Sequence, residues 1–221
     1  MSEGEGAALA RAAEKAYLTV RERILSGIYP AASRLTEQEI ATASGVSRTP
    51  VREALRRLQA EGYVTASANQ GAVVAEWTAD DVNDVFELRA LLEPYGAARA
   101  ARYITPEGIA QLRELAERQY RESEVRGPGF IERIGELNSR FHRQLQAFSR
   151  NTRLSKLMPV LVEAPLVLKT FTRYTPAELL RSAHHHLEIV SALEAHDPEW
   201  AAAVMRTHIL AAQSGDRRRS T

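Results

Sequence analysis

The chain has 221 residues, of which 44% are hydrophobic, with a formal net charge of +1 and no cysteine. This composition is typical of a globular protein of one large or two small domains, and the absence of cysteine excludes disulfides and thiolate metal sites. No apolar run reaches the roughly 18 residues that a membrane span needs. The N-terminal sequence MSEGEGAALA lacks the basic segment of a secretory signal. We therefore expect a cytoplasmic protein.

The first third of the chain contains short helical patterns. Apolar residues recur at helical spacing over Tyr17–Ile28, and a Gly-Ile-Tyr-Pro sequence ends this pattern. Thr36 and Glu39 have the spacing of a capping box, which predicts the start of a second helix. Gly45 stands where a glycine commonly ends a helix. The short segment after Gly45 is therefore predicted to be a turn between two helices.

A third helix is predicted to begin directly after Ser47 and to run over Arg48–Glu61. Its apolar stripe consists of Val51, Ala54, Leu55 and Leu58. Two strand-like runs joined by a polar turn follow over residues 63–75. Two helices joined by a short turn and followed by a hairpin form a winged helix-turn-helix, which we expect over residues 8–76.

The first turn of this third helix presents two arginines and two hydroxyl side chains, on a different face from the apolar stripe. These residues are Ser47, Arg48, Thr49 and Arg52. Arginine can grip guanine edges or contact phosphate, and hydroxyls and helix N-terminal amides suit phosphate oxygens. Helix-turn-helix proteins place this end of the helix in the major groove. DNA recognition is therefore expected, and the alternative is a solvated basic helix that binds nothing.

Residues 79–215 are predicted to form one helix after another, with almost no strand signal. The helices are separated by capping, proline and glycine signals at Thr78, Thr105-Pro106, Gly127-Pro128-Gly129, Asn151, Thr175-Pro176 and Asp197-Pro198. This pattern is typical of a helical bundle. The predicted fold class is therefore mainly α, with a winged helix-turn-helix followed by an all-helical domain that binds an effector and dimerises.

Three histidines of the second domain are candidate metal ligands. His142 lies four residues after Asn138, so the two share a helix face. His186 and His208 lie at equal sequence distances before and after Asp197. If Asp197 marks the turn of an antiparallel helix pair, both histidines lie ~16 Å from that turn. Three imidazoles and an amide oxygen suit a divalent metal, but each histidine could equally be an ordinary surface or core residue.

Two runs and the residues after them resemble the GntR family of bacterial regulators. The runs are Arg34–Ala41 and Gly45–Leu55, followed by Leu58, Glu61-Gly62-Tyr63-Val64 and Gly71. The resemblance implies base and phosphate contacts by the third helix, supported by the second helix and the wing tip. Gln38 replaces a residue that is commonly basic in the family, so a contact there would be made by an amide. The expected DNA-binding residues are Ser47, Arg48, Thr49, Arg52, Thr36, Gln38, Gln70 and Gly71.

The sequence from Asp80 to Glu93, together with the segments around the three histidines, is similar to the FCD ligand domain of the FadR subfamily. The resemblance implies a metal, zinc first and nickel or manganese as alternatives, held by an acidic residue and three histidines. These positions map to Asn138, His142, His186 and His208, with asparagine in place of the usual aspartate. The resemblance also implies small carboxylate effectors. Arg89 could clamp such a carboxylate or form an ion pair with Glu93, four residues away.

The expected function is a ligand-responsive transcription regulator that binds a palindromic operator as a homodimer. An effector bound in the helical domain would favour one arrangement of the two DNA-binding units. The alternative is a metal-dependent hydrolytic enzyme that uses the three histidines to activate water. No general base lies at motif spacing beside these histidines, so we do not expect an enzyme. A helical scaffold that binds only proteins would leave the basic helix unexplained.

Overall fold

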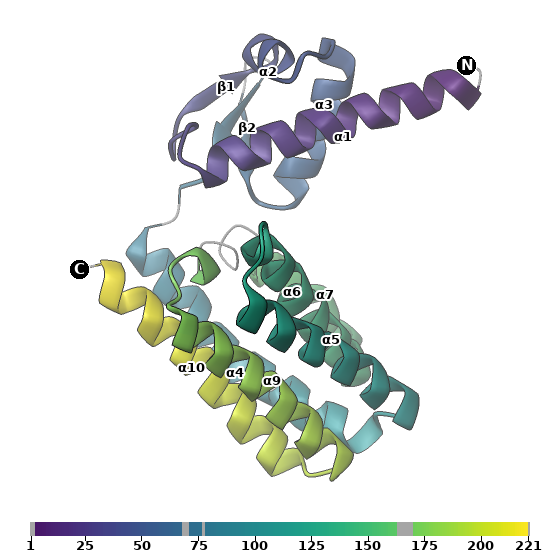
Figure 1. The fold of residues 1–221 in the computed structure, drawn as a ribbon, viewed down its shortest axis with the longest axis vertical. Coiled ribbons are helices and arrows are strands. Elements are labelled where there is room, and N and C mark those ends of the chain that lie inside the picture. Colours follow the sequence, from purple (N-terminus) through teal and green to yellow (C-terminus); the bar gives the residue numbers. More distant parts are fainter. Residues whose placement is uncertain (1–2, 68–70, 77, 163–169, 221) are drawn as a thin grey trace. The chain divides into compact units, whose positions relative to one another are not determined.

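The computed structural model describes residues 3–67, 71–76, 78–162 and 170–220. The chain divides into two compact units, Met1–Thr78 and Ala79–Thr221. The first contains helices and a small sheet, and the second contains helices alone among its described residues (Figure 1). The predicted fold class, a winged helix-turn-helix followed by a helical bundle, is therefore confirmed. No helix in the described parts of the chain is long and apolar enough to cross a membrane.

The first unit is a winged helix with a three-stranded sheet. Its elements are α1 (Glu3–Leu25), β1 (Arg34–Thr36), α2 (Glu37–Ser44), α3 (Arg48–Ala60), β2 (Val64–Ser67) and β3 (Gly71–Val74). The strands are ordered β1-β3-β2, and both pairs are antiparallel. The predicted hairpin therefore pairs with an additional strand, β1, which directly precedes α2. The core includes the large side chains of Tyr17, Ile40, Leu58 and Tyr63.

Local signals explain the sharp turn between α2 and α3. The backbone N–H of Glu39 donates to the Thr36 hydroxyl, and the Glu39 carboxylate accepts from the Thr36 N–H at 2.8 Å. This is the predicted capping box. Gly45 ends α2 with φ of 64°, a left-handed conformation that favours glycine. Ser47 is the N-cap residue of α3, but its side chain makes no capping hydrogen bond.

The second unit is a bundle in which helices distant in sequence lie side by side. Its described helices are α4 (Ala79–Tyr103), α5 (Pro106–Val125), α6 (Phe130–Phe148), α7 (Thr152–Leu161), α9 (Pro176–Glu194) and α10 (Pro198–Ser220). Helix α4 packs against α10 and α6, α5 packs against α6 and α9, and α9 packs against α10 (Figure 1). Large fully buried side chains such as Phe86, Phe141 and Met205 fill its interior.

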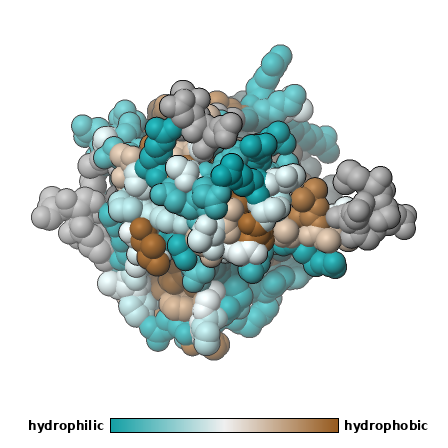
Figure 2. Space-filling model, turned by 90° about the horizontal axis from the view of Figure 1, so that it is seen from above, coloured by the Kyte–Doolittle hydropathy of each residue, from teal (hydrophilic) through white to brown (hydrophobic). Residues whose placement is uncertain are grey.

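Figure 2 shows one face of the surface, on which hydrophilic side chains predominate and apolar side chains gather in small separate groups. Single exposed apolar residues are normal on folded proteins. Only a set of them aligned on one element therefore indicates an interaction surface.

Candidate functional site

The N-terminal end of α3 presents the predicted DNA-binding side chains to solvent. Ser47, Arg48, Thr49 and Arg52 are all exposed. On the other side of the helix, Val51 and Leu58 are fully buried. The basic and apolar residues therefore lie on different faces, as the sequence predicted, and the first turn of α3 is accessible to a DNA groove.

Helix α2 holds both of these arginines. Arg48 donates to Gln38 Oε1 from Nε at 3.1 Å and from Nη2 at 2.7 Å. Arg52 Nε donates to Oε1 of the buried Glu37 at 2.8 Å. Gln38, considered as a DNA contact on the basis of sequence, thus serves as an acceptor that orients Arg48. The role of Glu37 was not predicted, because its contact spans 15 positions in sequence.

The remaining predicted DNA-binding residues have structural roles or lie outside the described part of the chain. The Thr36 hydroxyl is engaged in the capping box. Gly71 pairs with Thr36 across the sheet, and a Cβ at Gly71 would lie 2.2 Å from the Leu35 carbonyl oxygen. The close approach of β1 and β3 therefore requires glycine at this position. Gln70 lies outside the described residues.

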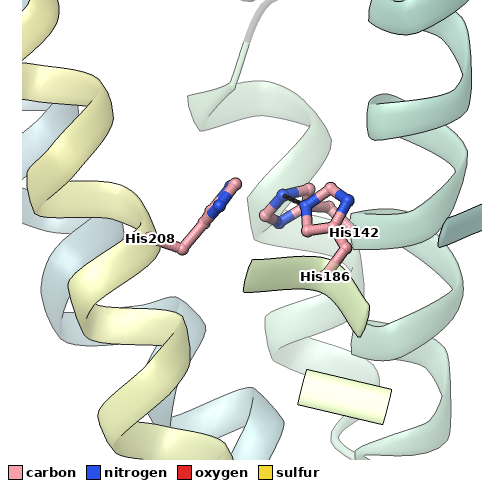
Figure 3. Close-up of side chains that lie close together, drawn as sticks. All are labelled: His142, His186 and His208. Atoms are coloured by element: carbon pink, nitrogen blue, oxygen red, sulfur yellow. Dashed lines mark hydrogen bonds between the residues drawn. The ribbon is translucent and has the colours of Figure 1, made fainter. Parts of the chain in front are cut away.

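Three helices of the bundle bring three histidines together. His142 on α6, His186 on α9 and His208 on α10 each offer a ring nitrogen, and these atoms lie within 4.8 Å of one another (Figure 3). The His186 and His208 ring centroids are 4.6 Å apart. His186 is fully buried, and His208 and His142 are 5% and 9% exposed. The predicted convergence of His186 and His208 across the turn at Asp197 is therefore present.

Acceptors behind two of the rings fix the ring nitrogens that carry protons. His142 Nδ1 contacts the Glu93 carboxylate of α4, and His186 Nδ1 lies 2.8 Å from Gln119 Oε1 of α5. Because both partners are acceptors, both Nδ1 atoms donate. When both rings are neutral, the two Nε2 lone pairs face each other across 3.2 Å, a contact that favours a cation or a proton between them. Metal-ligating histidines commonly have such partners on the other ring nitrogen.

Burial keeps two of the imidazoles neutral. It lowers the pKa of His186 well below the ordinary value, with the neighbouring His142 as the next cause. Burial also lowers the pKa of His208, with His186 as the next cause. A neutral imidazole is the form that binds a metal. The donor set of the cluster therefore fits a divalent cation.

A buried ion pair lies behind the cluster. Arg89 Nε donates to Glu93 Oε1 at 2.6 Å, and these side chains are 6% and 1% exposed. Burial opposes ionisation of Glu93, but the Arg89 guanidinium, together with the neighbouring His142, holds its pKa well below the usual range. The alternative considered for Arg89, an ion pair with the residue four positions on, is therefore present.

Asn138 is buried near His142, and within the described part of the chain its amide oxygen is free to act as a ligand. It lies one helical turn before His142 on α6 and is 4% exposed. Among the described residues, neither the Asn138 Oδ1 nor the Nδ1 of His208 has a hydrogen-bond partner, although both atoms are buried. Unsatisfied buried polar atoms are uncommon in proteins and call for a ligand, ion or water.

The sequence did not predict that Gln119 and His185 lie near this cluster. Gln119 is fully buried and contacts a histidine 67 positions away. His185 is partly buried, and its ring centroid lies 5.8 Å from that of His208. No spacing pattern connects α5 to α9, so the sequence contained no signal for the Gln119 contact.

Comparisons with known proteins agree with this architecture. The family model described as "Bacterial regulatory proteins, gntR family" matches residues 12–74, and the FCD domain model matches residues 84–211. The chain is 33% identical to the Nta operon transcriptional regulator of Aminobacter aminovorans over 177 residues, and this match covers 80% of each chain. It is 30% identical over 189 residues to the "Probable D-xylose utilization operon transcriptional repressor" of Paenarthrobacter nicotinovorans, covering 85% of this chain and 81% of that one.

Among solved structures, Escherichia coli McbR/YncC has the same fold with a TM-score of 0.73. That match covers 95% of this chain and 99% of the other at 22% identity. The similar proteins are transcription regulators and not enzymes, in agreement with the non-enzymatic function predicted from the sequence. This protein belongs to the GntR family of bacterial transcription regulators and carries the FCD domain of its FadR-like subfamily.

Proposed function

We propose that this protein regulates transcription as a homodimer that binds a palindromic operator and responds to a small anionic effector in its helical domain. One observation carries the proposal: the chain joins a pair of exposed, oriented arginines on α3 to a buried three-histidine cluster in a separate unit. Relatives described as an operon regulator and an operon repressor support it. Because its target is bacterial DNA, we place its action in the cytoplasm.

In this proposal, Arg48 and Arg52 read the operator, and Ser47 and Thr49 contact phosphates beside them. Gln38 orients Arg48 before DNA arrives, which lowers the ordering cost of binding. Two copies of α3 in a homodimer would contact equivalent half-sites about 34 Å apart, which explains why a palindromic operator is expected.

Replacing Arg48 with alanine tests the DNA-binding part of the proposal. Loss of a bidentate base contact costs about 1–3 kcal/mol, which corresponds to roughly 5–150-fold in affinity. Binding to DNA from the promoter region of its own gene can be measured by fluorescence anisotropy at fixed salt. The matched control is Arg56→Ala, on the same helix, whose side chain is 77% exposed and pairs with Glu53. Equal affinities of the two variants would refute the assignment of Arg48.

We further propose that His142, His186 and His208 hold a divalent metal, with the Asn138 amide oxygen as a fourth ligand. Zinc is the first expectation, and nickel and manganese are alternatives. The buried Oδ1 of Asn138 without a described partner and the facing Nε2 atoms support this assignment. Since asparagine is neutral, the bound metal would keep more net positive charge than it would beside an aspartate. That charge would attract a carboxylate effector as a further ligand.

Arg89 is the proposed second contact of that carboxylate. Its Nε is engaged by Glu93, but a guanidinium has five N–H donors and can hold two carboxylates at once. The ion pair would keep the arginine oriented toward the interior of the bundle. An effector bound to both Arg89 and the metal would bridge α4 to the helices that carry the histidines, and so could bias the bundle between two arrangements.

Metal content tests the histidine assignment directly. Elemental analysis of the purified double variant His142→Ala/His186→Ala should show metal near background, compared with about one ion per chain in the unaltered protein. The matched control is His184→Ala/His196→Ala, which removes two exposed histidines from the same unit. Metal at full occupancy in the first variant would refute the site.

A further inference from the structure

One face of α4 carries an apolar stripe that the bundle leaves exposed. Leu88, Leu91 and Tyr95 are 46%, 64% and 49% exposed. Their spacing of three and four residues aligns them on one side of the helix. The opposite side of α4 contributes buried residues such as Phe86 and Ala97 to the core. This alignment, unlike scattered exposed side chains, indicates a contact surface.

Charges of opposite sign lie at the two ends of this stripe. The exposed Asp84 lies one turn before Leu88, and Arg99 lies one turn after Tyr95. The Arg99 guanidinium carbon lies 5.9 Å and 5.4 Å from the ring centroids of Tyr95 and Tyr103, and its Nε donates to a backbone carbonyl. The stripe is therefore acidic at the N-terminal end of α4 and basic toward its C-terminal end.

A second copy of this stripe complements the first only when the two helices run antiparallel. With a two-fold axis beside Leu91, Asp84 of one copy faces Arg99 of the other, and Leu88 faces Tyr95. Leu91 then lies next to its own copy. A parallel arrangement would instead bring like charges together. Self-complementarity under a two-fold axis is the requirement for an isologous dimer contact.

We infer that this face of α4, defined by Asp84, Leu88, Leu91, Tyr95 and Arg99, is the site at which two copies of the chain associate as an antiparallel pair. The inference rests on the proposed homodimer and adds the surface and register to it. The apolar centre supplies the attraction, and the charged ends select the direction of pairing.

Because the chain has no cysteine, a single engineered cysteine tests the register without background. A disulfide needs Cα atoms about 4.4–6.8 Å apart. Under mild oxidation, Leu91→Cys should form a disulfide-linked dimer, seen on a non-reducing gel. In Leu88→Cys, the cysteine of one copy faces Tyr95 of the other. The two cysteines are therefore seven residues, or ~10 Å, apart along the helix axis and should not form a disulfide. The double variant Leu88→Cys/Tyr95→Cys should link again.

Val125→Cys serves as the control for random collisions, since Val125 is 77% exposed on α5. If Leu91→Cys links no faster than Val125→Cys, or if Leu88→Cys alone links equally well, the inference is overturned. As a second measurement, Leu91→Glu should raise the dimer dissociation constant at least tenfold in sedimentation equilibrium, with circular dichroism showing a native fold. An unchanged constant would also overturn it.

DNA binding by the unaltered protein separates this inference from the proposed function. A Leu91→Cys disulfide in a protein that binds no promoter DNA would support the interface and refute the regulator proposal. If the unaltered protein binds promoter DNA specifically as a dimer but Leu91→Cys forms no disulfide, the regulator proposal is supported. The dimer contact then lies on another surface, and the inference is overturned.

Discussion

The buried carboxylate of Glu93 joins the Arg89 cation to the imidazole of His142, and its charge can be removed without changing its shape. Its side chain is 1% exposed, accepts from Arg89 at 2.6 Å and contacts His142 through its other oxygen. Glu93→Gln preserves the volume of the side chain and one acceptor oxygen. It leaves the Arg89 guanidinium, which is 6% exposed, without its counter-charge.

The expected cost follows from this burial. Removing one partner of a buried ion pair costs about 3–5 kcal/mol, because the other charge stays in the interior uncompensated. We therefore expect the free energy of unfolding of Glu93→Gln to fall by that amount. The double variant Arg89→Met/Glu93→Gln removes the remaining charge and keeps an apolar side chain of similar length. It should recover at least about 2 kcal/mol relative to the sum of the single variants.

Urea unfolding of the metal-free protein, followed by far-ultraviolet circular dichroism, measures these differences. The matched control is Glu194→Gln, which breaks the ion pair between Glu194 and Arg113. The side chains of these two residues are 44% and 37% exposed. That variant should lose less than about 1 kcal/mol. If Glu93→Gln loses no more than the control, or if the double variant loses the full sum, the carboxylate does not compensate the buried cation and the reasoning fails.

Three further predictions concern the turn, the arginine support and pH. Gln38→Ala removes the acceptor of Arg48 and should weaken operator binding by about 1 kcal/mol in fluorescence anisotropy; equal affinity would show that the amide does not orient the arginine. Gly45→Ala forces alanine to φ of 64° and should destabilise the first unit by about 1–2 kcal/mol in thermal unfolding, whereas an unchanged midpoint would contradict the strain argument. The folded-state pKa values of His186 and His208 lie below the ordinary value of 6.5. Below about pH 6.5 the unfolded chain therefore binds more protons, and the metal-free protein should lose up to about 1.4 kcal/mol per pH unit for each histidine. If the urea concentration at the unfolding midpoint does not decrease as the pH is lowered from about 7 to 5.5, the result would argue against neutral buried imidazoles.

The features that the sequence predicted well depend on residues close together in the chain. The Thr36–Glu39 capping box and the helix end at Gly45 involve neighbours within a few positions, so the sequence is sufficient to identify them. The first helix was predicted less well. It was expected over Tyr17–Ile28, but α1 runs over Glu3–Leu25, and Leu18, an apolar residue of the expected segment, is 49% exposed. Which side of a long helix is buried depends on the elements that pack against it.

Strand β1 illustrates a second limit of local signals. Its three residues form a strand only because they pair with β3, more than 30 positions later in the chain. A segment this short has too little periodicity to be identified as a strand from the sequence. The sequence therefore predicted a two-stranded wing, and tertiary pairing provided the third strand.

The exposed basic turn of α3 and the convergence of His186 and His208 were determined by the sequence itself, because helical spacing and one predicted turn place these side chains. His142 joins them through the packing of α6 against α4 and α5. The tertiary structure decided which acceptors surround them. Glu93 and Gln119 contact histidines 49 and 67 positions away, and Gln38 supports an arginine on the next helix. These contacts depend on how separate helices pack, and they determine which ring nitrogens and guanidinium groups are ready to bind.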